Sequence, residues 1–318
     1  MTTTGMDIQI VLQKASEYRN WGKWGPDDEL GTMNYVTAEK VAAASRLVRK
    51  GKVFSLALPL DSDGPMNGSY GRINPVHVML QDGGDIASGA QDHLATLRYT
   101  DDAAYLVLQS STQWDALAHI YHDGKMYNGY GTEQVHSGGA LKNSITKIKD
   151  RAVGRGVLLD IARYKGKDAL ETSEPISADD LKGCAEQQGV SVGEGDFVLV
   201  RTGQMEQRRQ SGGWGDFAGG PAPGLAISAA DFFCPRNVAA VATDTWGTEV
   251  LPNETPDVFQ PLHIIMLVNA GIHLGEMWDM EALAKDCAED GVYEFMLVAP
   301  PLTVTGAVGS PVNPQAIK

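Results

Sequence analysis

The chain has 318 residues, 43% of them hydrophobic, so it is long enough to bury a substantial core in one or two domains. Acidic residues (40) outnumber Lys and Arg (26), and the formal net charge of −14 argues against nucleic acid or an anionic membrane surface as a partner. The sequence contains no apolar run of membrane-spanning length and no secretory signal pattern, so we expect a cytoplasmic protein.

Predicted helices and strands alternate along the chain, which indicates a mixed α/β domain with more sheet than helix. We expect an N-terminal arm over residues 1–35, in which Trp21 and Trp24 need a surface to pack against, followed by one domain over 36–318. Helices are predicted at Thr37–Val48, Ser177–Gly189, Leu262–Ala270 and Met280–Asp290. Strands are predicted at Val53–Leu58, Tyr105–Leu108, Val157–Asp160, Phe197–Arg201, Val238–Thr243 and Phe295–Val298.

The glycine-rich stretches and the cysteines indicate which ligands and cross-links to expect. The Gly-rich stretches Asp61–Gly89 and Ser211–Gly224 are predicted to be long loops that shape a pocket. Neither contains a phosphate-binding loop, so no nucleotide is expected. Cys184, Cys234 and Cys287 are widely spaced and without a CxxC pair, which predicts buried free thiols rather than disulfides or a thiolate zinc site.

A polar segment, Gln109–His119, follows the strand predicted at Tyr105–Leu108. If the extended conformation continues, the odd-numbered side chains share one face: Gln109, Ser111, Gln113, Asp115, Leu117 and His119. A buried polar group without a partner costs roughly 1–3 kcal/mol, so we expect this row to line a site. If the segment ends in a helix, Asp115 and His119 are still neighbours. Either geometry fits a divalent-metal site with a histidine base, or a simple buried hydrogen bond.

The segment resembles the signature HxGTHxDxPxH of the cyclase superfamily, which includes kynurenine formamidase, isatin hydrolase and trans-dienelactone hydrolase. Thr112, Asp115 and His119 match the signature, whereas Gln109 and Gln113 stand where its first two histidines fall and a leucine replaces its proline. Further blocks resemble the family in order between about Asn74 and Pro314: Asp123–Gly129, Gly154–Asp160, Ala242–Gly247, Pro261–His263, Gly271–Glu276 and Gly309–Pro311.

The resemblance implies a cyclase-type α/β domain with a swivelling β/β/α arrangement and a mixed sheet. It also implies a homodimer or homotetramer with exchanged arms. A metal site at Gln109, Gln113 and Asp115 would favour Mn²⁺ over Zn²⁺, because amide and carboxylate oxygens are hard ligands, although the loss of two imidazoles leaves a site without metal open.

In the family pattern His119 transfers a proton, and His263 and Glu276 assist. On one unbroken helix His263 and Glu276 would lie about 140° apart, so they can meet only if the helix breaks, for which Gly271 and Gly275 are candidates. Two further residues could contact the substrate: His77 from the early loop, and Trp114, for which a place in the core is the alternative.

Three functions are compatible with these residues. The first is metal-dependent hydrolysis of an amide, lactam or lactone bond in a small cyclic or aromatic compound. The second is metal-free acid/base catalysis by His119 and Asp115, as in a cyclase or isomerase. The third is non-catalytic binding of a small molecule on the same fold.

Overall fold

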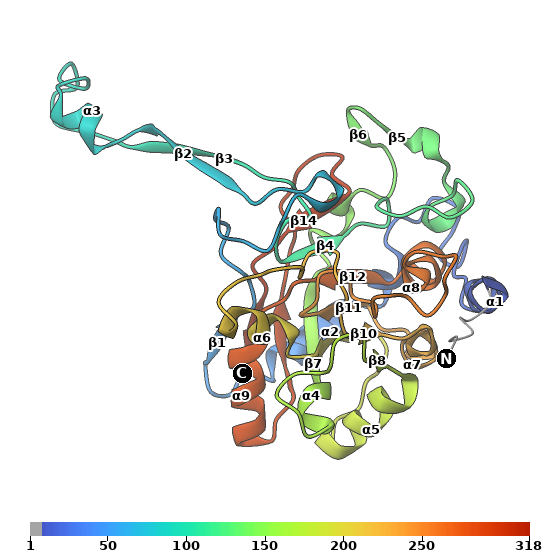
Figure 1. Ribbon diagram of the computed structural model, residues 1–318. Helices are drawn as coiled ribbons and strands as arrows, with labels where there is room; N and C mark the ends of the chain where they lie inside the picture. The colour runs from blue at the N-terminus through green and yellow to red at the C-terminus, as the bar shows by residue number, and fades with distance from the viewer. Residues whose placement is uncertain (1–7) are drawn as a thin grey trace.

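A mixed β-sheet forms the centre of the molecule in the computed structural model, which describes residues 8–318 (Figure 1). Within this range nine strands pair in the order β1-β15-β13-β7-β9-β11-β12-β4-β14. Their bounds, in that order, are Val53–Ser55, Gln315–Ile317, Glu294–Val298, Val153–Asp160, Phe197–Arg201, Ala240–Thr243, His273–Glu276, Gln113–Asp115 and Gly309–Pro311. The neighbours β7, β9, β11 and β12 run parallel, and the strands on either side pair antiparallel. The predicted α/β class with a mixed sheet is therefore confirmed.

Helices cover both faces of this sheet. The α-helices are α1 (Ile8–Glu17), α2 (Ala38–Ser45), α3 (Gly83–Ala87), α4 (Ile161–Tyr164), α5 (Ala178–Gln188), α6 (Gln204–Gln210), α7 (Ala230–Phe233), α8 (Pro261–His263) and α9 (Glu281–Asp290). Alternate residues of a strand point to opposite faces, so Val157 and Leu159 of β7 pack in the cluster containing α5 and α7, and Leu158 packs in the cluster containing α9. The core thus has two layers with the sheet between them.

Local signals account for most of the predicted helices. Thr37 accepts a hydrogen bond from the Lys40 amide at the start of α2, and Ser177 forms a capping box with Asp180 at the start of α5. Gly291 ends α9 in the left-handed conformation that favours glycine. α8 continues into a π-helical segment, Ile264–Ala270, as part of the helix predicted there.

One strand prediction was wrong. The apolar run after Tyr105 is not a strand; instead Tyr105 ends β3 (Asp101–Tyr105), which pairs with β2 (Val76–Gln81) in a hairpin. The chain then turns, with the Ser110 amide bonded to the Val107 carbonyl. Part of the glycine-rich stretch predicted as loop is therefore a strand. The remaining short pairs are β5 (Val135–His136) with β6 (Gly139–Ala140) and β8 (Pro175–Ile176) with β10 (Gly224–Leu225).

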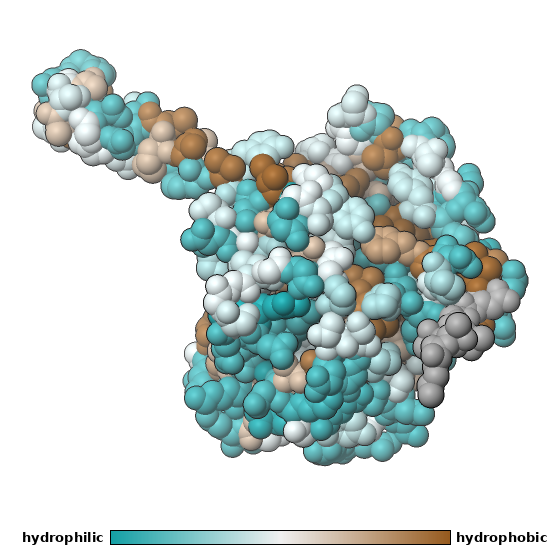
Figure 2. Space-filling model, viewed as in Figure 1, coloured by the Kyte–Doolittle hydropathy of each residue, from teal (hydrophilic) through white to brown (hydrophobic). Residues whose placement is uncertain are grey.

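The β2–β3 hairpin, capped by α3, projects away from the body of the molecule as an arm (Figure 1). Apolar side chains lie exposed along it, and brown atoms gather on the part nearer the body in Figure 2. They are Val76, Val78, Met79, Leu80, Leu97, Tyr99 and Tyr105. We call residues 76–105 the hairpin arm. Nothing on the described chain covers these side chains.

The N-terminal segment packs on its own chain. α1 lies against the π-helical segment Ile264–Ala270, and the Trp21 indole donates to the Val268 carbonyl at 2.8 Å. Trp24 packs edge-on against Tyr35, with ring centroids 5.2 Å apart. Both tryptophans therefore have the packing surface that the sequence requires, while residues 1–7 of the predicted arm lie outside the described range.

Two smaller expectations concern the cysteines and the membrane. All three cysteines are free thiols; Cys184 and Cys287 are buried and Cys234 is partly buried. Among residues 8–318, no helix has the length and apolar character needed to cross a bilayer.

Candidate active site

The floor of the candidate site forms where β4 and β12 pair. Their antiparallel register places Gln113 opposite Glu276. Side chains alternate along a strand, so Gln113 and Asp115 share one face of β4 and Trp114 lies on the other. The Gln113 Nε2 atom donates to Glu276 Oε2 at 2.8 Å and to Asp115 Oδ1 at 3.3 Å. Two carboxylates from distant parts of the chain thus meet in the protein interior.

His263 reaches this floor from α8. The following helix ends at Gly271, whose φ of +71° is a conformation that glycine adopts at little cost, and the chain then returns as β12. This break lets His263 Nε2 approach Glu276 Oε1 to 3.5 Å. The predicted meeting of these two residues through a broken helix is therefore observed, with the break at Gly271.

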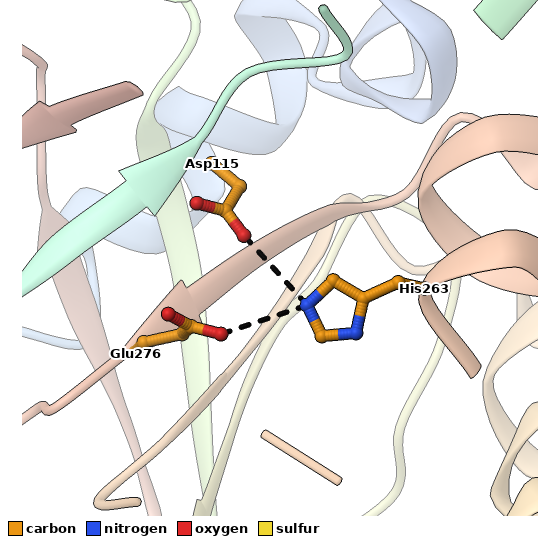
Figure 3. A group of neighbouring side chains, drawn as sticks. All are labelled: Asp115, His263 and Glu276. Carbon is orange, nitrogen blue, oxygen red and sulfur yellow. Dashed lines mark ion pairs between the residues drawn. The ribbon is translucent and has the colours of Figure 1, made fainter. Parts of the chain in front are cut away.

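Glu249 holds His263 in place. It accepts hydrogen bonds from the backbone amides of Leu262 and His263 at 2.9 and 2.8 Å, at the start of the helix, where the macrodipole favours a negative charge. Its Oε1 atom also lies 2.6 Å from His263 Nδ1. A carboxylate on one ring nitrogen orients the other, so His263 Nε2 is directed at Asp115 and Glu276 (Figure 3).

Asp115, His263 and Glu276 offer ligand atoms that all lie within 4.8 Å of one another (Figure 3). All three side chains are buried, and Asp115 Oδ2 has no hydrogen-bond partner although it is shielded from water. One imidazole and two carboxylates, with a further carboxylate behind the imidazole, form a donor set typical of divalent metal sites. The residues present therefore fit a divalent ion, and they differ from the predicted set in replacing the two glutamines with His263 and Glu276.

Burial and neighbouring charges shift the pKa values of Asp115, His263 and His119 in different directions. Burial raises the pKa of Asp115 to about 6, against the opposing pull of His119 and with the support of Glu276. Burial alone would lower the pKa of His263, but its hydrogen bonds to Glu249 and Glu276 raise it to about 10. Burial also lowers the pKa of His119, against the effect of Asp115. At neutral pH the site therefore pairs a neutral His119 with a protonated His263.

His119 stands beside this floor as expected. β4 ends at Asp115, and the chain turns so that the His119 amide bonds the Ala116 carbonyl. The His119 Nε2 atom lies 3.8 Å from Asp115 Oδ1, and 19% of the side chain is exposed. It is thus close enough to the carboxylate to interact with it, and open enough to meet a ligand.

The two glutamines of the signature take different positions. Gln113 is buried and donates to both carboxylates, as described above, while its Oε1 atom has no partner. Gln109 lies against Gly309, and its Nε2 atom is buried without a hydrogen bond. The structure therefore places Gln113 within the site and gives Gln109 no contact with the carboxylates.

The two predicted substrate contacts lie elsewhere. Trp114 is fully buried on the opposite face of β4, where it packs edge-on against Trp278 at 4.6 Å and donates to the Ala299 carbonyl. It is a core residue, because the strand alternation that exposes Asp115 to the site turns Trp114 away. His77 lies on the hairpin arm, paired with Asp102 at 2.7 Å. Neither side chain lines the cavity described next.

A cavity of about 360 Å³ opens above the floor. Asp115, His119, His263 and Glu276 form its base. Its other lining residues are Tyr70, Arg72, Ile120, Tyr121, Trp246, Phe259, Gln260 and Ile264. The volume is in the range of small-molecule sites. The predicted base and acid residues therefore share one pocket.

Several of these residues were not predicted from the sequence. Glu249 and Trp246 come from the segment that follows β11, and the carboxyl ends of parallel strands are a general position for ligand sites. Asp244 anchors this segment by accepting the Thr202 and Gly203 amides at 2.8 and 2.7 Å. The sequence signal that could have indicated Glu249 and Trp246 is their position just after a predicted parallel strand. Tyr70 and Arg72 come from the loop before the hairpin arm, within the Gly-rich stretch Asp61–Gly89 that was predicted to shape a pocket, although neither residue was singled out.

The chain is similar to proteins described as cyclases. A family model described as a putative cyclase matches residues 54–250, more than half of the chain. A crystal structure described as a novel cyclase is 38% identical and superposes with a TM-score of 0.87, covering 96% of this chain and 99% of its own. No match was found among curated proteins.

More distant structures share the fold. Isatin hydrolase A from Ralstonia solanacearum is 19% identical with a TM-score of 0.62, over 88% of this chain and 95% of its own. A predicted metal-dependent hydrolase from Bacillus stearothermophilus is 17% identical with a TM-score of 0.51, over 83% of this chain and 97% of its own. The family match, the similarity to the 38%-identical structure and the mixed α/β fold lead to one conclusion: the chain belongs to the cyclase family.

Proposed function

We propose that this protein is a hydrolase that opens an amide, lactam or lactone bond in a small cyclic or aromatic compound. The observation that carries the proposal is the buried group Asp115, His263 and Glu276 beside the partly exposed His119 in one cavity. The fold relatives named isatin hydrolase and metal-dependent hydrolase support the same reaction class.

Asp115, His263 and Glu276 would hold a divalent ion, with Glu249 orienting the imidazole. One nitrogen and two carboxylates make a ligand set rich in hard oxygen donors, which supports Mn²⁺ over Zn²⁺. When bound, such an ion supplies Lewis-acid polarisation of a carbonyl oxygen. Because the ion would replace the proton that His263 otherwise carries on Nε2, its binding is expected to release a proton.

His119 would move the proton of the reaction. Its lowered pKa leaves the imidazole neutral at pH 7, so the Nε2 atom can accept a proton from the attacking water. The same nitrogen can then return the proton to the leaving nitrogen or oxygen. Asp115, 3.8 Å away, stabilises the imidazolium that forms in between.

Replacement of His119 tests this role. We expect His119→Gln to lower kcat by roughly 10²–10⁴-fold, the usual contribution of a general base, while the metal content stays unchanged. The assay would follow hydrolysis of isatin, N-formylaniline and dihydrocoumarin as lactam, amide and lactone probes. His136→Gln removes an exposed histidine outside the cavity and is the matched control. Equal rates for His119→Gln and the wild type would refute the proposal.

A second candidate is metal-free acid/base catalysis of a ring-closing or isomerising step. It is favoured by one observation: His263 lies between Glu249 and Glu276, and the Gln113 amide donates to Asp115 and Glu276, so each buried carboxylate has a partner without an ion. Metal analysis after purification without chelators separates the two candidates. A stoichiometric divalent ion, with activity lost in EDTA and restored by Mn²⁺, supports hydrolysis; full activity in EDTA supports the second candidate.

A further inference from the structure

Arg72 is a cation in the cavity without a carboxylate partner. Several other partly or fully buried arginines form ion pairs, as Arg155 does with Asp196 and Arg201 with Asp160. Among the described residues, no acidic group lies within ion-pair distance of Arg72, and its hydrogen bond is a long one of 3.4 Å from Nη1 to the Gln109 carbonyl. A guanidinium has five N–H donors in a planar fork that matches a carboxylate. Most of this donor capacity is therefore unused.

An aromatic wall adjoins this cation. The Tyr70 ring lies nearly parallel to Trp246 at a centroid distance of 5.5 Å and to Phe259 at 6.0 Å. Arg72 lies over the Trp246 ring, with its Cζ atom 5.4 Å from the centroid. Tyr70 and Phe259 are more than half exposed at the mouth of the cavity. Trp246 is buried behind them, so Tyr70 and Phe259 are the rings of this wall that a planar ligand can reach and pack against.

The backbone at Tyr70 supports a binding role for this wall. Tyr70 has φ +57° and ψ 22°, a left-handed conformation that costs a non-glycine residue free energy. Gln260, next to Phe259, also has a positive φ of +52°. Unfavourable backbone conformations of this kind cluster where side chains must be held in particular places, such as ligand sites. Here two of them present residues to the same cavity.

The charge of the cavity selects what can bind beside Arg72. The floor carries Asp115 and Glu276, and the chain as a whole has a net charge of −14, so an anion is repelled from most of the site. Arg72 is the one Lys or Arg side chain among the described residues that line the cavity. An anionic group on a ligand would therefore lie at Arg72, which leaves the rest of the molecule between the aromatic wall and His119.

We propose that Arg72 and the wall formed by Tyr70, Trp246 and Phe259 select a planar aromatic compound that carries a carboxylate. The carboxylate pairs with the Arg72 guanidinium and the ring stacks on the wall. The cavity of about 360 Å³ accommodates one or two rings. This proposal rests on the proposed function only for the identity of the bond that is cleaved. Recognition of the ligand itself needs no turnover.

Benzoate and benzamide test it, since they share a ring and differ in charge. Binding is measured by calorimetry on the full-length chain treated with EDTA, so that an ion in the floor cannot bind the carboxylate. We expect the wild type to bind benzoate about 10- to 100-fold more tightly than benzamide, the range for a charge-assisted pair. Arg72→Gln removes this preference, Arg72→Lys retains part of it, and Tyr70→Ala weakens both ligands. Arg49→Gln, an exposed arginine outside the cavity, leaves both affinities unchanged.

The outcomes separate recognition from a purely structural role. If Arg72 only balances Asp115 or supports the loop, Arg72→Gln weakens both ligands alike, and the proposal is overturned. Equal wild-type affinities for benzoate and benzamide also overturn it, and this comparison needs no variant to fold. Cyclohexanecarboxylate, which has the charge but no aromatic ring, should bind more weakly than benzoate. A benzoate preference without any hydrolytic activity would sustain this proposal while contradicting the proposed function.

Discussion

The cavity floor and the hairpin arm both depart from the usual pattern of burial: the floor buries charged side chains, and the arm exposes apolar ones. The floor buries Asp115, His263 and Glu276, types that are seldom fully buried without partners. The arm leaves side chains such as Val78 and Leu80 about half exposed. A buried charge costs free energy unless it is paired, and an exposed apolar patch has no stabilising role in an isolated chain. Both regions are therefore places to test for an interaction, with a ligand in the floor and with another surface at the arm.

The two regions also differ in how they are held. Each charged side chain of the floor is positioned by a strand or helix and by a hydrogen bond with Gln113 or Glu249. The arm has a single ladder between β2 and β3 and no core of its own, and an isolated two-stranded hairpin is marginally stable in water. The floor is therefore held in a fixed geometry, while a contact with another surface would stabilise the arm.

The largest expected effect follows from removing one charge of the floor. Asp115→Asn keeps the shape but loses the carboxylate that faces both His263 and His119. A metal-assisted step depends on several kcal/mol of electrostatic stabilisation, so we expect activity to fall by at least about 10³-fold, together with the divalent ion. Metal content and kcat are measured on the same preparation. Undiminished activity would show that the buried charges serve only the fold.

Trp114, on the other face of the same strand, gives the contrasting case. It is fully buried in an apolar cluster, so Trp114→Ala is expected to lower the free energy of unfolding by about 3–5 kcal/mol. Urea denaturation measures this loss, and Trp114→Phe should cost less because it leaves a smaller cavity. If stability were unchanged while substrate affinity fell, Trp114 would be a substrate contact, as the sequence first suggested.

The sequence predicted those parts of the site that depend on residues close together along the chain. Asp115 and His119 are four residues apart, so the turn that follows β4 is enough to bring them to 3.8 Å, and Gly271 provides the break that His263 and Glu276 need. The sequence did not indicate Glu249, because this residue reaches the site from a segment whose path is set by tertiary packing. For Arg72 it predicted only that the surrounding Gly-rich stretch shapes a pocket. The apolar run after Tyr105 was misplaced for a related reason: cross-strand pairing with β2, rather than local hydrophobicity, decides where β3 ends.

His273 gives a smaller and pH-dependent effect. It is buried like His263, but its Nδ1 atom has no partner, and burial lowers its pKa to about 3. The unfolded chain takes up this proton near pH 6.5, so stability is fully present above that pH and is lost as pH falls towards 3, by up to about 1.4 kcal/mol per pH unit. His273→Gln should flatten this part of the stability profile measured by urea denaturation, whereas His136→Gln, at an exposed site, should not. Parallel profiles for all three proteins would contradict the prediction.

The smallest effect on the fold is expected from replacing exposed apolar residues of the hairpin arm. This replacement also tests whether the arm forms a contact. Val78 and Leu80 of β2 are both about half exposed, so replacing both with Ser leaves the core untouched, and we expect the free energy of unfolding to change by no more than about 0.5 kcal/mol. If the arm is the contact of the predicted homodimer or homotetramer, the double variant sediments as a smaller species than the wild type at equal concentration. Leu141→Ser, at an exposed apolar residue outside the arm, is the control and should sediment as the wild type does. If the wild type is a monomer, or if the double variant associates as the wild type does, the arm is not the contact between subunits.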